Sequence, residues 1–447
     1  TLVAPLGKIT LNATETLELS AGSVTSVSAD GLIIPFGVTE AELDWLYPLN
    51  SVSNLVLNSA PDKQIVLSAK DIDLAEGSVV DLSAGGDLFA YEFVPGLGGS
   101  SDYLQAGSDS SRGGFAILPS LGSGVAPFDH FQSNNAEFAN RETVYLDGSN
   151  GLAAGFYTKL PAHYALLPGA FLVTPVAGTQ DQSSSLRTLD GRQIVSGFNA
   201  VAGTNIRDAR SSGFLIENGA QVRKHSQYAE STGDAFFTKT AVANEKPMPL
   251  LAKDGGLISI LAQTRLALNA QFKVGAAFGN GAKMDIASNR LDVVDTLSET
   301  PNADVLEILA SDLSDLNIDS LLLGGGRNSR NADNETNISV VSEEVRIKSN
   351  SVLEVADIIL AAKKQLVVEE GASIIAKGTV NTGDQTLVVQ GDGALLRVSA
   401  DEQVDINRVY TTNQPQGLVG DLTVANSAVL EAGESMLIDA SHSSQVN

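Results

Sequence analysis

The chain has 447 residues, of which 43% are hydrophobic, so it can bury a large core as several domains or as one long repeat structure. Its 53 acidic residues outnumber 28 basic ones, and the net charge of −25 argues against the basic surface that nucleic-acid binding requires. The absence of cysteine excludes disulfides and a cysteine nucleophile. The sequence contains no run of about 18 apolar residues, so it predicts no membrane-spanning helix.

Residues 1–88 are predicted to form solenoid coils, with an excursion from the pattern at 32–61. Apolar and polar residues alternate in KQIVLSAKDIDLAEGSVVDLSAGG (63–86), which places one set of side chains on one face of each strand. A lone coil of this kind cannot bury its apolar face, so the coils are expected to stack as a parallel β-helix. Similar units recur later in the chain, at 255–279, 344–378 and 420–441. The opening TLVAPLGKITL lacks the pattern of a signal peptide, and we expect the chain to be an interior piece of something longer.

The excursion contains a capping-box pattern, with Thr39 at the cap and Glu42 three residues later. This pattern predicts a short helix over 40–46 that carries Trp45, the only tryptophan. Trp45 lies in an apolar cluster, so we interpret it as a packed helix anchor; a platform for sugar stacking is the alternative.

Residues 89–250 are predicted to be an insertion with its own small core. Most of the aromatic residues of the chain fall here, the charge is nearly balanced, and Gly and Pro punctuate the sequence. We expect a tight ladder of short strands at 151–178, an exposed loop at 178–186 and a β-meander at 187–240.

Residues 251–447 return to predicted β-helix coils. The segment 301–323 suits a helix or short strands, and we predict a strand, one helical turn near 311–317 and a second strand at 320–323. A polar loop follows at 327–337, and 338–441 gives the cleanest solenoid pattern.

No motif of strong chemical specificity is present. The segment GNGAKM (279–284) contains Gly and Lys but lacks the spacing of a phosphate-binding loop, and we place it in a coil corner. Asp71 and Asp73 share one face of a strand, but we expect no basic or histidine partner on the neighbouring coils. The pairs Glu343-Glu344 and Glu369-Glu370 are interpreted as solvated turns, because adjacent strand residues point to opposite faces.

Two histidines are candidate site residues. His163 lies in an apolar stretch and is interpreted as a hydrogen-bonded structural residue, in preference to a catalytic one. His130 lies between aromatic residues, and we favour packing there over the lining of a pocket. Glycosylation sequons, a pattern that is common by chance, begin at three asparagines: Asn12, Asn334 and Asn337.

Several segments resemble recurring segments of very large filamentous-haemagglutinin-like exoproteins, the secreted partners of two-partner secretion systems. These segments are GSVTSVSADGLIIPFG (22–37), ELDWLYPL (42–49), GSVVDLSAGGDLFAYEFVPGLGGS (77–100), GFYTKLPAHYALLPGAFLV (155–173) and DSLLLGGGR (319–327). The resemblance implies an all-β chain folded as a right-handed parallel β-helix and exported through an outer-membrane transporter partner. It also implies roles in adhesion, biofilm cohesion or contact-dependent competition. The family's asparagine-rich secretion domain is not recognised here.

The sequence therefore predicts a secreted, cell-surface structural adhesin that binds a glycan or a receptor on a host or neighbouring cell. It predicts no enzyme and assigns no catalytic, cofactor or metal-binding residue. Two alternatives stay open. One is a β-helix polysaccharide lyase or hydrolase, which would need carboxylates, or a carboxylate and an arginine, to converge in one groove. The other is a subunit that self-associates into an extracellular fibre.

Overall fold

The computed structural model divides into two compact units, which are described separately. Unit 1 comprises residues 1–32, 58–88 and 233–447, and unit 2 comprises residues 33–57 and 89–232. The residues that the structure describes are 1–49, 53–96, 99–105, 114–121, 142–149, 151–182, 184–275, 279–300, 302–328, 335–410 and 418–447.

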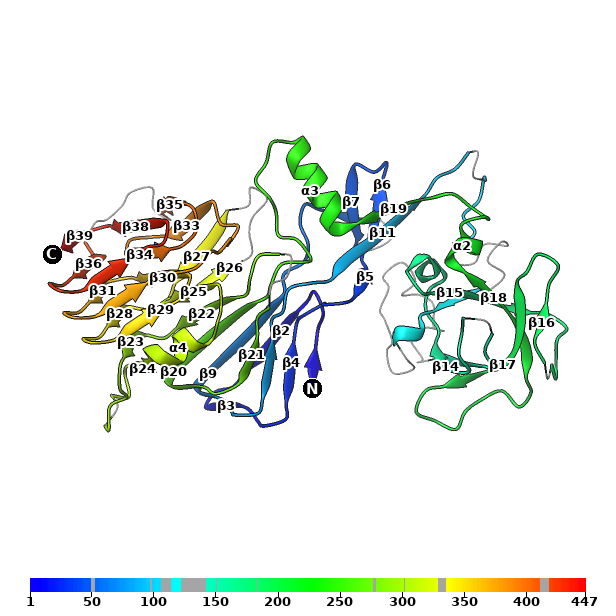
Figure 1. Cartoon of the computed structure of the whole chain (residues 1–447), viewed down its shortest axis with the longest axis horizontal. Coiled ribbons are helices and arrows are strands. Elements are labelled where there is room, and N and C mark those ends of the chain that lie inside the picture. Colours follow the sequence, from blue (N-terminus) through cyan, green and yellow to red (C-terminus); the bar gives the residue numbers. More distant parts are fainter. Residues whose placement is uncertain are drawn as a thin grey trace. The chain divides into compact units, whose positions relative to one another are not determined.

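The largest sheet of unit 1 runs through nine strands that are far apart in sequence (Figure 1). They are β2 (Lys8–Asn12), β3 (Thr16–Leu19), β9 (Gln64–Leu74), β20 (Leu257–Leu268), β22 (Lys283–Ala287), β25 (Ser320–Leu323), β30 (Asp357–Ala362), β34 (Ala394–Ser399) and β38 (Ser435–Ala440). Pairing is parallel from β2 through β30 and antiparallel between β30, β34 and β38. In β9 every second residue is buried on either side of Lys70, where the alternation shifts by one residue; apart from this shift, it is the alternation that the sequence predicts.

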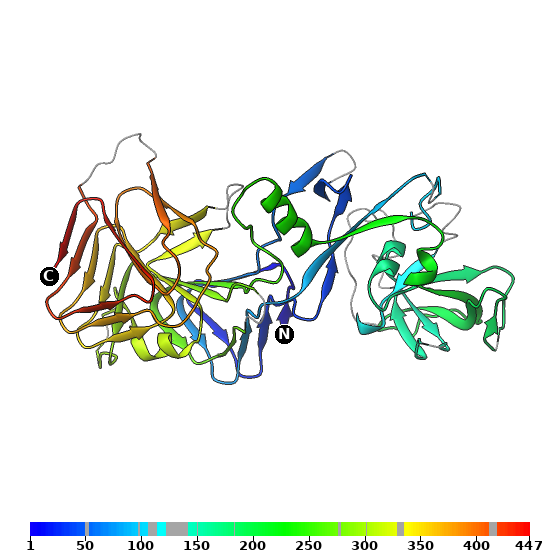
Figure 2. The same ribbon diagram turned by 45° about the horizontal axis from the view of Figure 1, so that its top comes forward.

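Three further ladders of unit 1 are parallel throughout. The first joins β1 (Leu2–Val3), β4 (Val24–Ser26), β10 (Val79–Asp81) and β21 (Gln271–Lys273). The second joins β24 (Leu306–Leu309), β23 (Arg290–Val294), β28 (Glu344–Ile347), β31 (Gln365–Val368), β36 (Asp421–Val424) and β39 (Ser443–Val446). The third joins β29 (Val352–Glu354), β32 (Ser373–Ile375) and β37 (Val429–Glu431). Figure 2 shows β28, β31 and β36 side by side, from yellow to red.

One apolar core runs along these ladders. Its buried members extend from Leu17 to Val424 in the sequence. Three of them, Ile65, Ile286 and Leu360, are fully buried. The core is continuous because each strand contributes its inward side chains beside those of the strands it pairs with.

A second layer lies outside the largest sheet of unit 1. Its strands are β26 (Gly325–Asn328), β27 (Thr336–Val340), β33 (Thr386–Gln390) and β35 (Asp405–Val409). A separate apolar cluster joins Ile338 and Leu387 of this layer to Leu322 and Ile359 of the large sheet. The chain turns from β25 into β26 at Gly324, where φ is +94° and a Cβ atom would lie 2.0 Å from the carbonyl oxygen of Ala361. The close backbone approach therefore requires glycine at this corner.

Unit 1 has two helices among the described residues. The predicted helical turn near 311–317 is present as α4 (Ala310–Asp315), between β24 and β25. The helix α3 (Gly233–Ala243) corrects the predicted β-meander over 187–240, which holds only as far as Asn218. Asp234 in the first turn of α3 suits the positive end of the helix dipole.

Unit 2 contains an antiparallel sheet that closes on itself. Its strands, in spatial order, are β12 (Phe115–Ile117), β15 (Phe171–Val176), β18 (Ser212–Asn218), β17 (Gln193–Val201), β13 (Glu142–Leu146) and β14 (Gly155–Thr158), with β16 (Leu186–Arg187) beside β17. Ala116 of β12 and Leu160, which follows β14, exchange two backbone hydrogen bonds of 2.8 Å. These bonds join the last strand in the spatial order to the first and close the sheet. The interior is packed by apolar residues such as Val144, Val173 and Phe214.

Unit 2 also contains short elements outside this barrel. They are the 3₁₀ turns η1 (Pro119–Leu121) and η3 (Ala162–Leu166) and the helix α2 (Gly219–Val222). A three-stranded sheet joins β5 (Ile33–Pro35), β11 (Asp87–Phe93) and β19 (Tyr228–Thr232), and another joins β6 (Val38–Glu40), β7 (Asp44–Pro48) and β8 (Asn54–Leu57).

The predicted helix over 40–46 is wrong, because this segment forms the hairpin β6–β7. Ala41 and Glu42 have φ values of +52° and +55°, so they turn the chain between the two strands instead of starting a helix. The local capping pattern is overridden by strand pairing, since Val38 pairs with Leu46 and Thr39 with Trp45.

The prediction of an all-β chain with short helices is confirmed. A right-handed parallel β-helix is not shown for the chain and stays a prediction, because the sheets are mixed. The antiparallel pairs β30–β34 and β34–β38 and the antiparallel barrel of unit 2 depart from it.

Candidate functional site

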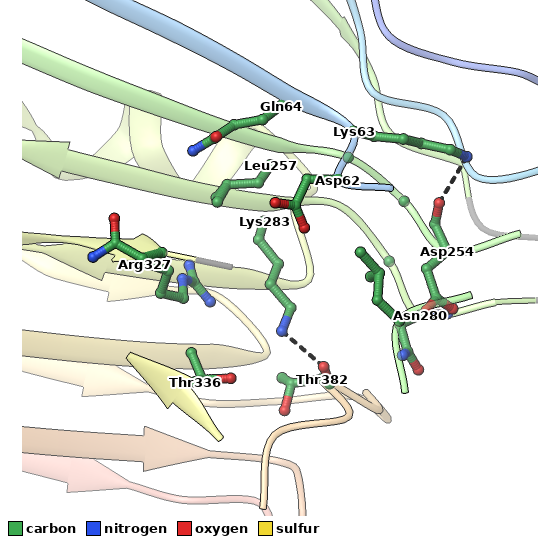
Figure 3. Close-up of a pocket in the computed structure, with 15 residues that line it drawn as sticks. Asp62, Lys63, Gln64, Asp254, Leu257, Asn280, Lys283, Arg327, Thr336 and Thr382 are labelled. Carbon is green, nitrogen blue, oxygen red and sulfur yellow. Dashed lines mark hydrogen bonds between the residues drawn. The ribbon is translucent and has the colours of Figure 1, made fainter. Parts of the chain in front are cut away.

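A recess in unit 1, lined mostly by polar and charged residues, lies where β9, β20 and β22 begin (Figure 3). Its volume is about 80 Å³. The described lining residues are Asp62, Lys63, Gln64, Leu250, Asp254, Gly255, Gly256, Leu257, Asn280, Gly281, Lys283, Arg327, Asn328, Thr336 and Thr382. The recess thus gathers three basic side chains in a chain that is strongly acidic.

Lys63 is held by the backbone of two distant loops. Its Nζ donates to the carbonyl oxygen of Gly85 at 2.8 Å and to that of Asp254 at 2.9 Å, and the residue is only 5% exposed. Burial lowers the pKa of Lys63 to about 8, although nearby carboxylates, Asp254 foremost, act in the opposite direction. The ammonium group therefore ties the start of β9 to these two loops at an electrostatic cost.

Lys283 points across the recess toward Thr382 (Figure 3). Its Nζ donates to the carbonyl oxygen of Thr382 at 2.7 Å and to Asp384 Oδ1 at 3.0 Å. The hydroxyl of Thr336 donates to the same carboxylate oxygen at 2.7 Å. Because the Asp384 side chain is only 2% exposed, the lysine charge is neutralised inside the protein.

The polar groups continue behind the recess as a buried ionic network. Arg327 Nε donates to Asp285 Oδ1 at 2.7 Å, and its Nη1 donates to Ser320 Oγ, also at 2.7 Å. Ser320 in turn donates to Asp357, which accepts from Arg397 Nε at 2.7 Å. These groups lie between the large sheet and the second layer, and burial raises the pKa of Asp285 while Arg327 acts against that shift.

The size of the recess decides what it can hold. Ligand sites of drug-sized molecules occupy roughly 300–1,000 Å³, whereas about 80 Å³ has room for a few waters. The charged groups described above are also engaged with internal partners. We therefore interpret the recess as a structural junction rather than a substrate site.

Two larger hollows lie in unit 2. One, of about 450 Å³, is mostly apolar and is lined by η3 and the following turn, the start of α2 and the end of β19. The other, of about 480 Å³, is lined by Gly99 and residues 223–228. Both volumes fall within the range of ligand pockets.

A fully buried carboxylate organises the second hollow. Glu217 of β18 is 0% exposed and accepts hydrogen bonds from Tyr103 Oη at 3.1 Å and Arg192 Nη1 at 3.2 Å. His225 Nε2 lies 2.8 Å from the same carboxylate, and the ring of Tyr103 stacks on the imidazole with a centroid distance of 4.0 Å. Glu217 thus fixes the orientation of a histidine whose side chain is 32% exposed.

The structure places the predicted aromatic and histidine residues as follows. Trp45 is 0% exposed, and its Nε1 donates to the carbonyl oxygen of Phe36 at 2.8 Å, so it is a packed anchor on a strand rather than on a helix. His163 lies in η3 and stacks on Tyr91 with a centroid distance of 5.4 Å. His130 lies outside the described residues.

The expectation that Asp71 and Asp73 lack a basic partner is wrong. A register shift in β20 brings Arg265 opposite Asp71, and its Nη2 lies 3.4 Å from Asp73 Oδ2. Thr264 also donates to Asp71. This shift depends on strand pairing, which the spacing within one strand does not reveal.

The paired glutamates form surface ion pairs. Glu343 pairs with Lys363 and Lys364, and the hydrogen bond from Lys364 is the main cause that lowers the pKa of Glu343. Glu344 pairs with Arg290 on the neighbouring strand β23 and with Arg346 on its own strand, β28. Glu369 pairs with Lys348.

The other predicted positions divide between the recess and the surface. GNGAKM, which we place in a corner, contributes Asn280, Gly281 and Lys283 to the recess. Asn12 is exposed at the end of β2, Asn337 lies in β27, and Asn334 lies outside the described residues.

Sequence reasoning missed the residues that carry the buried polar groups, among them Asp285, Arg327, Asp357, Arg397 and Glu217. The signal that was available is a charged residue at an otherwise apolar position of a predicted strand, as in MDIA (284–287) and LLRVS (395–399). An ionised side chain at such a position requires a buried partner.

Comparisons of the chain with protein-family models, with curated proteins and with solved structures gave no match. Among the described residues, no helix is both long enough and apolar enough to cross a membrane. The part of the chain that the structure describes also contains no group of three or more His, Asp or Glu side chains placed to hold a metal ion.

Proposed function

We propose that the chain is part of a secreted, cell-surface structural adhesin, exported through an outer-membrane transporter partner. In this proposal unit 1 is a stacked scaffold of the right-handed parallel β-helix type, and unit 2 is the part that contacts a glycan or a receptor on another cell. The protein would act in attachment, cell–cell cohesion or the formation of a biofilm matrix.

The observation that carries the proposal is the parallel ladder from β23 to β39 on one continuous apolar core. Each added strand lengthens such a stack by about 4.8 Å and buries the apolar face of the strand before it. A stack of this kind can serve as a scaffold for other parts of the chain. The ligand-sized hollows and most of the aromatic residues lie in unit 2, which suits a contact role because aromatic side chains dominate recognition surfaces.

The polysaccharide lyase or hydrolase alternative is less well supported. The recess of unit 1 does bring Arg327 and carboxylates together, as that alternative requires. Its small volume and the internal pairing of Lys283 and Arg327 leave no open groove for a sugar chain.

The test is retention on cells. Beads coated with the full chain are mixed with epithelial cells and with a bacterial biofilm, and albumin-coated beads are the control. The proposal predicts retention well above the control on at least one surface, and retention equal to albumin on both would overturn it. Cleavage of a polysaccharide panel by the same preparation would favour the enzyme alternative.

A further inference from the structure

We propose that the hollow of unit 2 beside His225 binds an anionic sugar, through the side chains of Lys224 and His225. This inference rests on the proposed adhesin function, because it names the class of ligand that unit 2 would contact. We call this hollow the His225 pocket; its described lining residues are Gly99 and Arg223, Lys224, His225, Ser226, Gln227 and Tyr228.

The charge of the lining differs from that of the chain as a whole. Three successive basic side chains line the His225 pocket, and none of its described lining residues is Asp or Glu. The chain carries 53 acidic residues against 28 basic ones, so a hollow with this lining is unusual here. Three carboxylates lie just behind this lining and bond to it: Glu217, Glu230 and Asp102. A cation of the lining that none of them pairs would therefore favour a negatively charged group.

The three basic side chains are not equally available to a ligand. Arg223 is engaged by Glu230, with Nε–Oε1 and Nη2–Oε2 distances of 2.5 and 2.7 Å, and also donates to the carbonyl oxygen of Leu166. Lys224 forms no ion pair or side-chain hydrogen bond with any described residue and is exposed. Lys224 is thus the cation that a ligand can neutralise.

His225 is held ready to contact the same ligand. Glu217 is an acceptor when ionised, so the Nε2 atom of His225 carries the proton that is shared with it. The Nδ1 atom then has a lone pair that can accept a sugar hydroxyl, and after protonation it can donate to an oxyanion. Among the described residues Nδ1 has no hydrogen-bond partner.

The size and surface of the His225 pocket suit a sugar. A volume of about 480 Å³ has room for one or two pyranose rings, and Tyr228 is among the lining residues. The hydroxyl of Tyr228 donates to Asp102 Oδ1 at 2.7 Å, so the ring is held in place. The anionic group could be a carboxylate or a sulfate, which share the geometry of two or more oxygens that accept from Lys224.

The experiment is titration calorimetry of the full chain with three probes: tetragalacturonate, a sulfated dextran oligomer and neutral dextran of the same length. We expect binding of at least one anionic probe and none of neutral dextran. The anionic probe that binds identifies the carboxylate or the sulfate as the recognised group. Equal binding of neutral dextran, or binding of no probe, would overturn the inference.

Two variants locate the site. Lys224→Gln and His225→Gln should each weaken the binding of the anionic probe by about tenfold or more, because the first removes a charge-assisted contact and the second removes the imidazole that hydrogen-bonds the sugar. Lys239→Gln is the matched control, since Lys239 is an exposed lysine on α3 of unit 1, and it should bind as the unchanged chain does. Unchanged affinity in both pocket variants, with the fluorescence of Trp45 also unchanged, would place the site elsewhere.

The failure of this inference can be told apart from the failure of the proposed function. Chain-coated beads that stay on cells, while the pocket variants bind both cells and glycans normally, leave the adhesin proposal intact and remove the His225 pocket from it. Beads that fail to stay on cells, while the His225 pocket binds the anionic probe, retain the site and overturn its role in adhesion.

Discussion

The two units solve the problem of the exposed strand edge in different ways. In unit 1 the edge of each parallel strand pairs with the next strand along the stack, so the apolar core of the unit continues from strand to strand. In unit 2 the sheet is antiparallel and closes through Ala116 and Leu160, so its core is finite. A stack can grow without changing its cross-section, whereas a closed barrel fixes its size and leaves its outside free for binding.

The units also differ in how they bury charge. Unit 1 places a connected set of Arg, Asp and Lys between two sheets, whereas the described part of unit 2 buries the carboxylate of Glu217 beside a histidine, an arginine and a tyrosine. The first arrangement pairs its charges internally. The second leaves one side of His225 exposed.

The largest effect is expected from removal of one partner in the buried ionic network. Arg327→Met leaves the carboxylate of Asp285, which is 1% exposed, without its guanidinium, and should destabilise unit 1 by about 3–5 kcal/mol. Urea unfolding followed by far-UV circular dichroism measures the change. The control is Arg265→Met, whose side chain is 64% exposed and whose ion pair contributes about 0–1 kcal/mol. A loss no larger than that of the control would show that the network does not hold the two layers together.

A large effect confined to the barrel is expected from Phe214→Ala. Phe214 is 1% exposed in the barrel interior, and the cavity should destabilise unit 2 by about 3–4 kcal/mol. Trp45, the only tryptophan, lies in unit 2, and its fluorescence reports this unit during urea unfolding. Phe156→Ala on β14 is the matched control, because Phe156 is 48% exposed. Equal shifts in the two variants would contradict a barrel held by its interior.

The next effect depends on pH and concerns Lys63. Its folded pKa of about 8 lies below the ordinary value of 10.5, so the unfolded chain binds more protons between these values. The penalty for a charged Lys63 is therefore fully present below pH 8 and is relieved as the pH rises to about 10.5. The stability of the unchanged chain relative to Lys63→Met should rise by about 3 kcal/mol over this range. A difference that stays constant from pH 7 to 10.5 would contradict the lowered pKa.

The smallest effect is expected from loss of one hydroxyl in the barrel. Tyr157→Phe removes the hydrogen bond to the carbonyl oxygen of Ala153, which is 2.6 Å long, and should cost about 1 kcal/mol. Tyr145→Phe on the neighbouring strand is the control, since the hydroxyl of Tyr145 bonds to no described residue. The two midpoints, measured by Trp45 fluorescence, should differ by that amount, and identical midpoints would show that the buried hydroxyl contributes nothing net.

The sequence by itself determined the all-β character and much of the apolar core. Ile65 and Leu67 lie two positions apart, as do Ile72 and Leu74, and all four are fully buried, because side chains two apart on a strand share one face. The predicted order of strand, helical turn and strand in 301–323 is also confirmed. Both the strand period of two and the helical spacing of three to four residues are visible in that short segment.

Only the tertiary structure decided the features that depend on pairing between distant strands. The hairpin at 38–48 overrode a capping pattern, and the register shift in β20 supplied Asp73 with Arg265. The pair Arg397–Asp357 joins residues 40 positions apart, and Glu217 meets Tyr103 across 114 positions. Hydrophobic alternation specifies which face a residue occupies, but the partner on that face is set by strand order and register, which no local pattern contains.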